Sequence, residues 1–319
     1  MDLSVIVPLY NEEDNLKLLY HAITNALLPL HLNYEILFVD DGSRDSTFVR
    51  AAELARIDSR LRVIKFRRNY GQTPAMVAGI EHAKGDILIT MDGDLQNDPK
   101  DIPIFLDKLR EGYDIVVGWR YNRQDKLITR KIPSRIANWL IGKITGVPIK
   151  DNGCSLKAYR ANFIQSIPLY SEMHRFIPAM ASIAGTRIAE VKVSHHARRH
   201  GKSKYGLSRI YKVLLDLLVI KTLLAFFSRP MVGFALAAMT TGVVSSAALI
   251  AALFEALNGT DQPTAVFFGL GVLYAALAIT LLFWGMLAEI IYRTGDLRRE
   301  VLANLATNNQ KAAAKSLGT

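Results

Sequence analysis

Two acidic side chains separated by a single glycine occur at Asp92-Gly93-Asp94. If both carboxylates turn toward one point, their repulsion is costly unless a cation lies between them. Hard divalent ions such as Mg²⁺ and Mn²⁺ take carboxylate oxygens together with the phosphate oxygens of a substrate. The aspartate pair therefore predicts a site for a divalent metal ion and a diphosphate.

A basic segment, HHARRHGKSK, runs from His195 to Lys204. It is suited to a phosphate monoester, whose second pKa of about 6 leaves it anionic near neutral pH and in no need of a general base. Gly201 and Ser203 would let the backbone approach such a phosphate. A solvated loop and a patch attracted to anionic lipid remain open as alternatives. Zinc is disfavoured because there is no paired cysteine or His-x₃-His spacing.

The aspartate pair follows one of several predicted strands in an α/β arrangement. Helical segments with apolar residues three and four apart separate these strands, which indicates a mainly parallel sheet with flanking helices. The predicted strands are Leu3 to Val7, Glu35 to Val39, Arg62 to Phe66, Ile87 to Met91 and Asp114 to Val117. The predicted helices are Asp14 to Leu27, Ser46 to Ile57, Thr73 to Ala83 and Pro99 to Arg110, the last with Asp98 as N-cap.

Ligands of such sheets bind beyond the carboxyl ends of the strands. Polar residues follow the first, second and fourth predicted strands at Pro8 to Glu13, Asp40 to Ser46 and Asp92 to Pro99. Each stretch alone is explicable by turn and capping chemistry, and for Asp41-Gly42 alone a turn is favoured. Together they predict a polar binding site at one edge of the sheet.

Composition limits the broad class of protein. The chain has 319 residues, 50% of them hydrophobic, and a single cysteine, Cys154, so it is neither disordered nor built on internal disulfides. Its 39 Lys and Arg against 29 Asp and Glu give a net charge of +10, which suits an anionic partner. Nucleic acid is disfavoured, since no DNA-binding motif or aromatic-interleaved basic surface occurs.

The apolar residues concentrate near the carboxyl terminus. Met231 to Phe254 and Ala265 to Ala288 are each 24 residues long without a charged residue or histidine. As helices they would be roughly 36 Å long, enough to cross a bilayer core of about 30 Å. Basic residues flank the outer ends and none lies in the turn 258–263, so both termini are expected in the cytoplasm. Two buried helices of a soluble domain are the alternative.

The predicted layout has four parts. Residues 1–207 form a cytoplasmic domain that begins with a strand, since the apolar run at the amino terminus is too short for a signal peptide. Residues 208–229 form interfacial amphipathic helices, or a helix packed on the soluble domain. Residues 230–292 hold two transmembrane helices, 231–257 and 265–290, and residues 293–319 form a cytoplasmic tail. Small residues between Ala235 and Ala252 would allow homo-oligomers.

Five motifs in this order resemble those of inverting family 2 glycosyltransferases of the GT-A fold, a Rossmann-like mainly parallel sheet. The similarity is greatest to the polyprenyl-phosphate glycosyltransferases, which include dolichyl-phosphate mannose synthase and bacterial undecaprenyl-phosphate enzymes. The match runs from residue 3 to about residue 228, ahead of the two apolar helices. The motifs are PxYNE (Pro8 to Glu12), DDGSxD (Asp40 to Asp45), DxDxQ with DP (Asp92 to Pro99), GxRY (Gly118 to Tyr121) and RxxGxSKY (Arg198 to Tyr205).

The resemblance implies roles for individual residues. A nucleotide-diphosphate sugar would be bound by Pro8, Tyr10, Asn11, Glu12, Asp41, Asp92, Gln96, Arg120 and Arg130, and the metal by Asp92, Asp94 and Gln96. The acceptor phosphate would be bound by Arg130, Arg198, Ser203 and Lys204, and the catalytic group would be Asp94, Asp151, Arg198 and Lys204. Asp151 would act as a base or position the acceptor. The true equivalent of Arg130 could instead be Arg123, Lys126, Lys131 or Arg135.

The resemblance also implies the reaction. One sugar would move from a UDP- or GDP-sugar to undecaprenyl phosphate or a similar polyprenyl phosphate, with Mg²⁺ or Mn²⁺, at the cytoplasmic face of the inner membrane. A processive polysaccharide synthase is disfavoured, because the sequence has no Gln-x-x-Arg-Trp motif and only two apolar spans. An inactive membrane-tethered nucleotide-sugar-binding scaffold is disfavoured by the complete aspartate pair and basic segment.

Overall fold

The computed structural model describes residues 1–121, 138–139, 141–143, 146–165, 176–183, 186–197, 230–259 and 261–294. The chain forms two compact units, Met1–Ile220 and Lys221–Thr319. The interfacial helices predicted at 208–229 and the tail from residue 295 onward lie outside the described residues. The predicted limits of those parts remain predictions.

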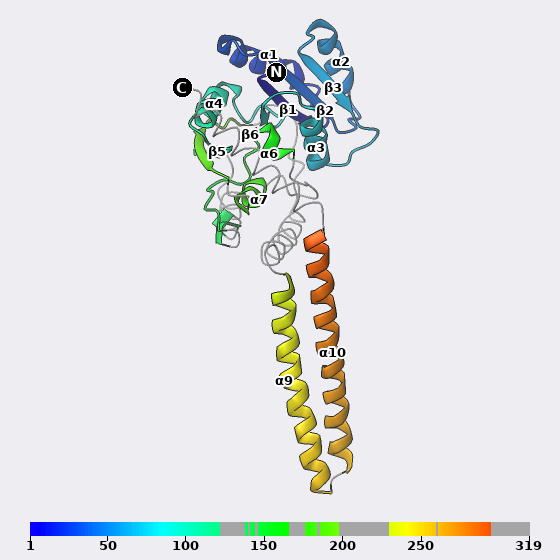
Figure 1. The fold of residues 1–319 in the computed structure, drawn as a ribbon. Coiled ribbons are helices and arrows are strands. Elements are labelled where there is room, and N and C mark those ends of the chain that lie inside the picture. The colour runs from blue at the N-terminus through cyan, green and yellow to red at the C-terminus, as the bar shows by residue number, and fades with distance from the viewer. Residues whose placement is uncertain are drawn as a thin grey trace. The chain divides into compact units, whose positions relative to one another are not determined.

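The first unit is built on a sheet with the strand order β3-β2-β1-β4-β6-β5-β7 (Figure 1). β6 is antiparallel to β4 and β5, and the other pairings are parallel. The predicted mainly parallel sheet is therefore confirmed, with β6 and β7 in addition to the five predicted strands. The strands are β1 (Leu3–Leu9), β2 (Tyr34–Asp40), β3 (Leu61–Lys65), β4 (Ile87–Thr90), β5 (Ile115–Arg120), β6 (Lys157–Arg160) and β7 (Ile188–Val193).

Each of the four predicted helical segments is helical in the structure. Asp98 caps the last of them, because its side chain accepts a hydrogen bond from the backbone N–H of Lys100 while Pro99 occupies the first helical position. The helices of this unit are α1 (Leu16–Leu27), η1 (Leu28–Leu30), α2 (Thr47–Ile57), α3 (Gln72–His82), η2 (Pro99–Asp101), α4 (Ile102–Arg110), α6 (Ala161–Ile164) and α7 (Ile177–Ile183).

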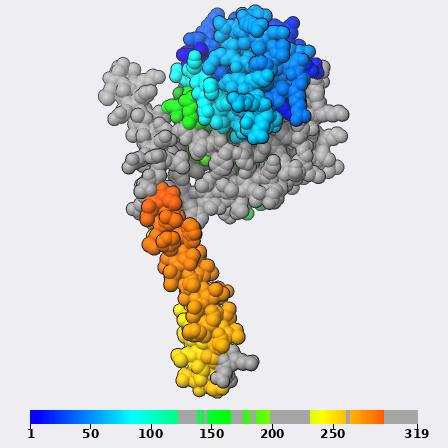
Figure 2. All heavy atoms as spheres, turned by 90° about the vertical axis from the view of Figure 1, so that its right-hand side faces the viewer, coloured from blue at the N-terminus to red at the C-terminus, as the bar shows by residue number. Residues whose placement is uncertain are grey.

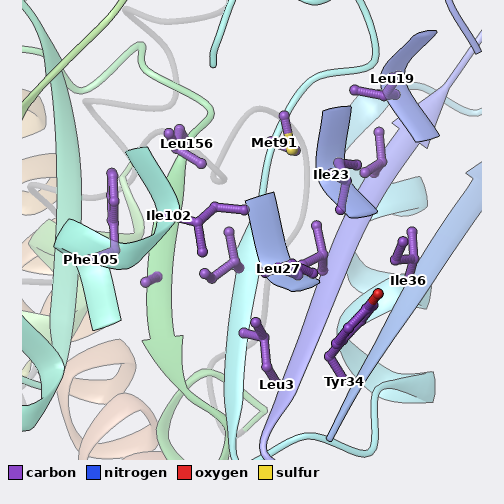
Figure 3. Close-up of a cluster of buried hydrophobic side chains, with 14 of the residues drawn as sticks. Leu3, Leu19, Ile23, Leu27, Tyr34, Ile36, Met91, Ile102, Phe105 and Leu156 are labelled. Atoms are coloured by element: carbon purple, nitrogen blue, oxygen red, sulfur yellow. The ribbon is translucent and has the colours of Figure 1, made fainter. Parts of the chain in front are cut away.

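Two hydrophobic clusters cover the two faces of the sheet. Alternate residues of β1 enter different clusters, with Val5 and Val7 in one and Ile6 in the other. In the first cluster, α1 contributes Ile23 and α4 contributes Phe105 (Figure 3). The second cluster packs α3 and α7 on the opposite face. Because both faces are covered, the edge formed by the carboxyl ends of the parallel strands is the place for chemistry.

Asp58 follows α2 and is hydrogen-bonded both to α1 and to Arg60, which precedes the edge strand β3. Its carboxylate accepts hydrogen bonds from Tyr20 Oη of α1 at 2.7 Å and from Nε and Nη2 of Arg60 at 2.9 and 3.0 Å. The hydrogen bond from the Arg60 side chain is the main cause that lowers the pKa of Asp58 from 3.8 to about 2, against the effect of burial. The charged carboxylate therefore stabilises the folded state.

Asp58→Asn is expected to lower the free energy of unfolding at neutral pH by about 2 kcal/mol, since each pKa unit corresponds to about 1.4 kcal/mol. The folded-state pKa is the lower one, so this contribution is complete above about pH 4 and is lost as the pH falls toward about 2. Urea unfolding of the full chain in detergent, followed across that range, checks the effect. Asp107→Asn removes the exposed pair with Arg110 and serves as control. Equal losses in the two variants would contradict the assignment.

The second unit contains the two apolar helices α9 (Pro230–Leu257) and α10 (Asp261–Thr294), which lie side by side in Figure 1. Figure 2 shows the same pair from the side of α10. Gly271 and Gly285 of α10 allow close packing, because an added Cβ would lie 2.6 Å from the Leu249 side chain and 2.8 Å from Phe234 Cβ. Ser245 Oγ donates to the carbonyl of Gly271 at 2.7 Å. The two helices thus form a hairpin.

Both helices are long and apolar enough to cross a membrane, over Met231–Leu257 and Thr264–Ile291. Only 17% and 6% of their most apolar windows are buried inside the structure. Core helices of a soluble domain would be mostly buried, so the hairpin fits a membrane-anchored protein. The turn is shorter than the predicted 258–263, because α10 already begins at Asp261.

Candidate functional site

The loops after β1 and β2 are fastened to each other by hydrogen bonds. The backbone N–H of Asn11 donates to Ser43 Oγ at 2.9 Å, and Asn11 Oδ1 accepts from the N–H of Arg44 at 2.9 Å. The N–H of Glu12 donates to Thr47 Oγ1 at 2.8 Å. Asn11 has a positive φ of 52°, a conformation that asparagine tolerates better than most residues. These bonds bring the first two predicted polar stretches, with Pro8, Tyr10, Asn11 and Glu12 in the first, to one place.

Gly42 allows the turn after β2 to approach the loop after β3. Its φ is +65°, and an added Cβ would lie 2.4 Å from the carbonyl carbon of Arg68. A side chain at this position would therefore strain the backbone and also displace neighbouring backbone atoms.

Gly42→Ala is expected to lower the free energy of unfolding by about 2 to 5 kcal/mol, of which about 1 to 2 kcal/mol is the cost of the left-handed backbone and the remainder is overpacking. Gly146→Ala is the matched control, since Gly146 has φ +74° and nothing lies within 4 Å of an added Cβ. Denaturant unfolding of both variants isolates the steric part. The same loss in both would show that the close approach to Arg68 has no energetic weight.

Asp41 organises the segment that follows β3. Its carboxylate accepts hydrogen bonds from Asn69 Nδ2 at 2.9 Å, from the N–H of Tyr70 at 2.7 Å and from the N–H of Gly71 at 2.9 Å. Burial raises the pKa of Asp41, and the two backbone hydrogen bonds oppose that rise. The carboxylate is therefore engaged by protein donors and fixes the position of residues 69–71.

The next residue, Gln72, links this segment to the predicted metal pair. Gln72 is the first residue of α3, and its Nε2 donates to Oδ1 of Asp92 at 2.6 Å. Residues Asn69–Gln72 thus connect Asp41 at the end of β2 with Asp92 after β4, and they are called the bridging segment below. A shift of this segment would move groups at both of its ends.

Asp94 shapes its own loop. Its Oδ1 accepts a hydrogen bond from the backbone N–H of Gln96 at 3.1 Å, an arrangement typical of an Asx turn. Between them Leu95 has a φ of +60°, which is unusual for a residue with a branched side chain. Such backbone strain costs about 1 to 3 kcal/mol and is concentrated at functional sites. Asp94 is buried, so its carboxylate is held within the loop.

The start of the basic segment and the residue before it are attached to the same loop. His195 bridges to Asn97, the N–H of His196 donates to the carbonyl of Gln96 at 2.9 Å, and Nε2 of His196 lies 3.2 Å from Oδ2 of Asp98. Ser194 also donates its N–H to Asp101 Oδ2 at 2.7 Å. The chain therefore enters the predicted acceptor-binding region from a fixed point beside the aspartate pair.

Arg120 and Asp151 form a buried ion pair. Arg120 Nε donates to Asp151 Oδ2 at 2.7 Å and Nη2 donates to Oδ1 at 2.8 Å, so that the pair is bidentate. The side chains are 15% and 4% exposed. Burial alone would lower the pKa of Arg120, but the hydrogen bonds and charge of Asp151, with a contribution from the charge of Asp92, raise it. Arg120 is thus a permanent cation whose charge is felt at Asp92 of the aspartate pair.

Glycine and lysine complete the surroundings of this ion pair. A Cβ on Gly153 would lie 3.2 Å from Nη2 of Arg120, so glycine leaves room for the guanidinium. The buried Nζ of Lys157 donates to the carbonyl of Asn152 at 3.2 Å. This hydrogen bond from Lys157, the first residue of β6, holds the loop that carries Asp151 in place.

A divalent metal ion is compatible with the donors that the structure brings together. Within the described ranges, no group of three or more His, Cys, Asp and Glu side chains could hold a metal ion without other ligands. A pair of carboxylates suits a different kind of site, in which substrate phosphates and water supply the remaining ligands, as is usual for Mg²⁺. Asp92 and Asp94 fit that chemistry, with one oxygen of each held by Gln72 or Gln96.

The structure brings most of the predicted site residues to one edge of the sheet. Arg130, Arg198, Ser203 and Lys204 lie outside the described residues. The bridging segment Asn69–Gln72 was missed, although it follows β3 just as the predicted stretches follow β1, β2 and β4. Applying the same rule to the third strand would have found it.

Comparison with known proteins identifies sequence relatives over most of the chain. Residues 4–182 match the family described as Glycosyl transferase family 2. A dodecaprenyl-phosphate galacturonate synthase of Rhizobium johnstonii is 44% identical over 92% of this chain and 88% of its own length. An undecaprenyl-phosphate 4-deoxy-4-formamido-L-arabinose transferase of Aeromonas hydrophila subsp. hydrophila is 37% identical over 91% of this chain and 88% of its own length.

A solved enzyme shares the fold. Glucosyl-3-phosphoglycerate synthase from Mycobacterium tuberculosis, in complex with Mn²⁺, uridine diphosphate and phosphoglyceric acid, superposes with a TM-score of 0.54 at 20% identity, covering 69% of this chain and 78% of that chain. The same enzyme with Mn²⁺ and UDP-glucose gives a TM-score of 0.53 at 20% identity over the same shares. With the family match, this likeness confirms the predicted GT-A fold class.

Proposed function

The chain belongs to glycosyltransferase family 2, and we propose that it transfers one sugar from a nucleotide-diphosphate sugar to a polyprenyl phosphate, with inversion at the anomeric carbon. The product would be a lipid-linked monophosphosugar. The observation that carries this proposal is the similarity, over nearly the whole chain and including the apolar hairpin, to transferases named for dodecaprenyl and undecaprenyl phosphate.

The donor side of the proposal rests on the aspartate pair and Arg120. Departure of the nucleotide requires that the negative charge developing on its diphosphate be neutralised. Asp92 and Asp94 would hold a divalent ion, Mg²⁺ or Mn²⁺, which supplies Lewis-acid stabilisation when bound. The guanidinium of Arg120 adds a fixed positive charge beside Asp92. Gln96 would complete this group.

The nucleoside would bind between the ends of β1, β2 and β3. Pro8, Tyr10 and Glu12 line the end of β1, where the loops after β1 and β2 are bound to each other. The carboxylate of Asp41 would act through the backbone of Tyr70 and Gly71, which it holds in place. The bridging segment would then set the distance from the nucleoside to the metal. UDP and GDP donors both remain candidates.

The acceptor side requires charge more than base catalysis. The second pKa of a phosphate monoester is about 6, so its oxygen is already a nucleophile near neutral pH. Asp151 would therefore position Arg120 instead of removing a proton. Both carboxylate oxygens of Asp151 already accept hydrogen bonds from the Arg120 guanidinium, which supports this role. Arg130, Arg198, Ser203 and Lys204 would bind the acceptor phosphate.

The hairpin would place the reaction at the membrane that contains the lipid. Both termini and the first unit would lie in the cytoplasm, because the turn between α9 and α10 carries no Lys or Arg while basic residues flank the outer ends. Nucleotide sugars are soluble and polyprenyl phosphates are membrane lipids, so an enzyme that joins them must work at the bilayer surface.

The proposal is tested by incubating the full chain, in detergent or proteoliposomes, with undecaprenyl phosphate and labelled UDP- and GDP-sugars, including uronic acids and aminopentoses. Mg²⁺, Mn²⁺ and EDTA are compared in parallel. Label is expected in a single lipid monophosphosugar, with no transfer in EDTA. Growth of a polymer would indicate a processive synthase, and donor binding without transfer to any acceptor would indicate a scaffold. Either result would overturn the proposal.

A further inference from the structure

A cluster of aromatic rings and lysines lies at the end of β5, on the face of the strand opposite to Arg120. The register of β5 and β7 pairs Trp119 with Lys192, whose Nζ lies 5.8 Å from the centroid of the Trp119 ring and 4.5 Å from that of Tyr121. Lys150 Nζ lies 4.1 Å from the Trp119 centroid. The two rings meet edge to face at 5.1 Å. Arg120, between them in sequence, points instead to Asp151.

A further ring and lysine, Trp139 and Lys143, belong to a segment attached to the loop that carries Lys150. Lys143 Nζ lies 5.2 Å from the centroid of Trp139. Just before Trp139, Asn138 donates through Nδ2 to the carbonyl of Lys150 at 2.8 Å and accepts from the N–H of Asn152 at 3.3 Å. Asn138 therefore ties the helical segment that carries Trp139 and Lys143 to the loop that carries Lys150. We call these residues together the aromatic–lysine patch: Trp119, Tyr121, Trp139, Lys143, Lys150 and Lys192.

The patch is exposed and positively charged. Tyr121 is 65% exposed and Trp139 is 63% exposed, although large rings usually bury most of their surface. Glu190 is the acidic neighbour on this face of β7, and its carboxylate accepts the backbone N–H of Lys150 at 2.7 Å. Burial is the main cause that raises the pKa of Glu190, and the backbone N–H and the charge of Lys150 oppose that rise. Exposed rings of this size, each beside an ammonium group, indicate a surface that contacts a membrane or another molecule.

We propose that the aromatic–lysine patch docks the first unit onto the head-group layer of an anionic bilayer. Tryptophan and tyrosine are enriched at membrane interfaces, where the ring lies among the head groups. Each lysine near an anionic surface contributes favourably, and its ammonium has three donors, so contact with a ring leaves others for lipid phosphate. The same chain carries two helices long enough to span a bilayer, so such a surface is present where the protein works.

This inference depends on the membrane attachment proposed above and not on the identity of the sugar or acceptor. Docking at the patch would restrict the tilt of the first unit against the bilayer. Because Arg120 lies on the opposite face of the same strand, that restriction would also fix the orientation of the reaction site relative to the bilayer.

The three tryptophans of the chain allow a direct test, because Trp119 and Trp139 belong to the patch and Trp284 lies within α10. Three full-length variants each keep one tryptophan and carry phenylalanine at the other two positions. Each is reconstituted into vesicles of phosphatidylglycerol or phosphatidylcholine, with and without bromine near the head-group end of the acyl chains. Emission from Trp119 and Trp139 is expected to fall about twofold in brominated phosphatidylglycerol and less in brominated phosphatidylcholine.

A double lysine variant tests whether the quenching of Trp119 depends on the positive charge of the patch or only on its closeness to the bilayer. Lys150→Gln with Lys192→Gln is expected to bring quenching of Trp119 in phosphatidylglycerol down to the phosphatidylcholine value. Lys108→Gln is the matched control, since Lys108 is also near a ring, 6.0 Å from the Tyr113 centroid, but lies outside the patch.

Trp284 distinguishes failure of the docking surface from failure of membrane attachment. In one outcome, brominated lipid quenches Trp284 but not Trp119 or Trp139, and these two are quenched by iodide in the aqueous phase. The patch then faces water or a protein partner, and the inference is wrong. If Trp284 is not quenched either, membrane attachment itself fails. Equal quenching of the patch in both lipids would refute the charge-dependent docking. The variant that keeps Trp119 retains the native residue in β5, so a folding defect from its replacement does not affect this measurement.

Discussion

Asp94→Ala is expected to abolish sugar transfer, with a loss of about a thousandfold or more in kcat/KM. The residue combines two tasks that alanine cannot perform. Its charge would help to hold the divalent ion against the leaving diphosphate, and its Oδ1 closes the turn to Gln96 in which Leu95 has a positive φ. Transfer of label from donor to polyprenyl phosphate measures the effect.

Asp94→Asn separates those two tasks. Asparagine keeps an oxygen that can accept the N–H of Gln96, so the turn is preserved, but it removes the charge that a hard cation requires. Transfer is therefore expected to fall nearly as far as with alanine, and Mn²⁺ binding, followed by electron paramagnetic resonance with the nucleotide diphosphate present, is expected to weaken.

Asp86→Ala is the matched control for both Asp94 variants. Asp86 precedes the opposite end of β4, where its carbonyl accepts the N–H of Ala161, and transfer should stay within about threefold of the parent. Full activity of the asparagine variant would mean that Asp94 shapes the loop without binding the ion.

Loss of the Arg120–Asp151 ion pair is expected to have the second largest effect. Asp151→Ala leaves a buried guanidinium without its counter-ion and free to turn away from Asp92. Transfer is expected to fall by about a hundredfold to a thousandfold, comparable to removing a fixed electrostatic group from an active site. Arg120→Ala should produce a similar loss.

A double-mutant cycle tests whether Asp151 acts through Arg120 or by itself. If Asp151 only positions Arg120, the double variant is expected to be no more than about threefold worse than Arg120→Ala, because residues that act as a unit are not additive. The pH dependence of kcat in Asp151→Asn should also keep the shape of the parent curve. Losses that multiply, together with the disappearance of an acidic limb, would instead identify Asp151 as a general base.

The pair formed by Arg160 and Asp114 is the control for that cycle. The charged atoms Arg160 Nε and Asp114 Oδ1 are 3.8 Å apart, and both side chains are partly exposed. Asp114 precedes β5 at its amino end, away from the end that carries Arg120. Asp114→Asn is expected to change transfer by less than about threefold. A comparable loss there would show that the assay reports general destabilisation.

The regular part of the fold could be predicted because its signals are local. Runs such as Glu35 to Val39 have strand character by themselves, and Asp98 with Pro99 marks a helix start without reference to the rest of the chain. The aspartate pair could be recognised for the same reason, since its chemistry lies within three consecutive residues. The two apolar helices were evident from length and composition alone.

Long-range contacts were not predictable in this way. The antiparallel strand β6 is only four residues long, and it is inserted between β4 and β5 by pairing that no local pattern specifies. The same holds for the contact of Gln72 with Asp92 across 20 residues and of Arg120 with Asp151 across 31 residues. Sequence placed Arg120 and Asp151 in the site, but only the fold makes them partners.

The bridging segment constrains how the enzyme could acquire a different donor. Asn69–Gln72 is bound to Asp41 at one end and to Asp92 at the other. A substitution there that enlarges or reshapes the proposed nucleoside pocket would therefore also move Asp92, a proposed ligand of the metal ion. Recognition and turnover are thus coupled through four residues. Laboratory selection for a new nucleotide should accordingly recover changes at Tyr10 or Asn11 before changes in this segment.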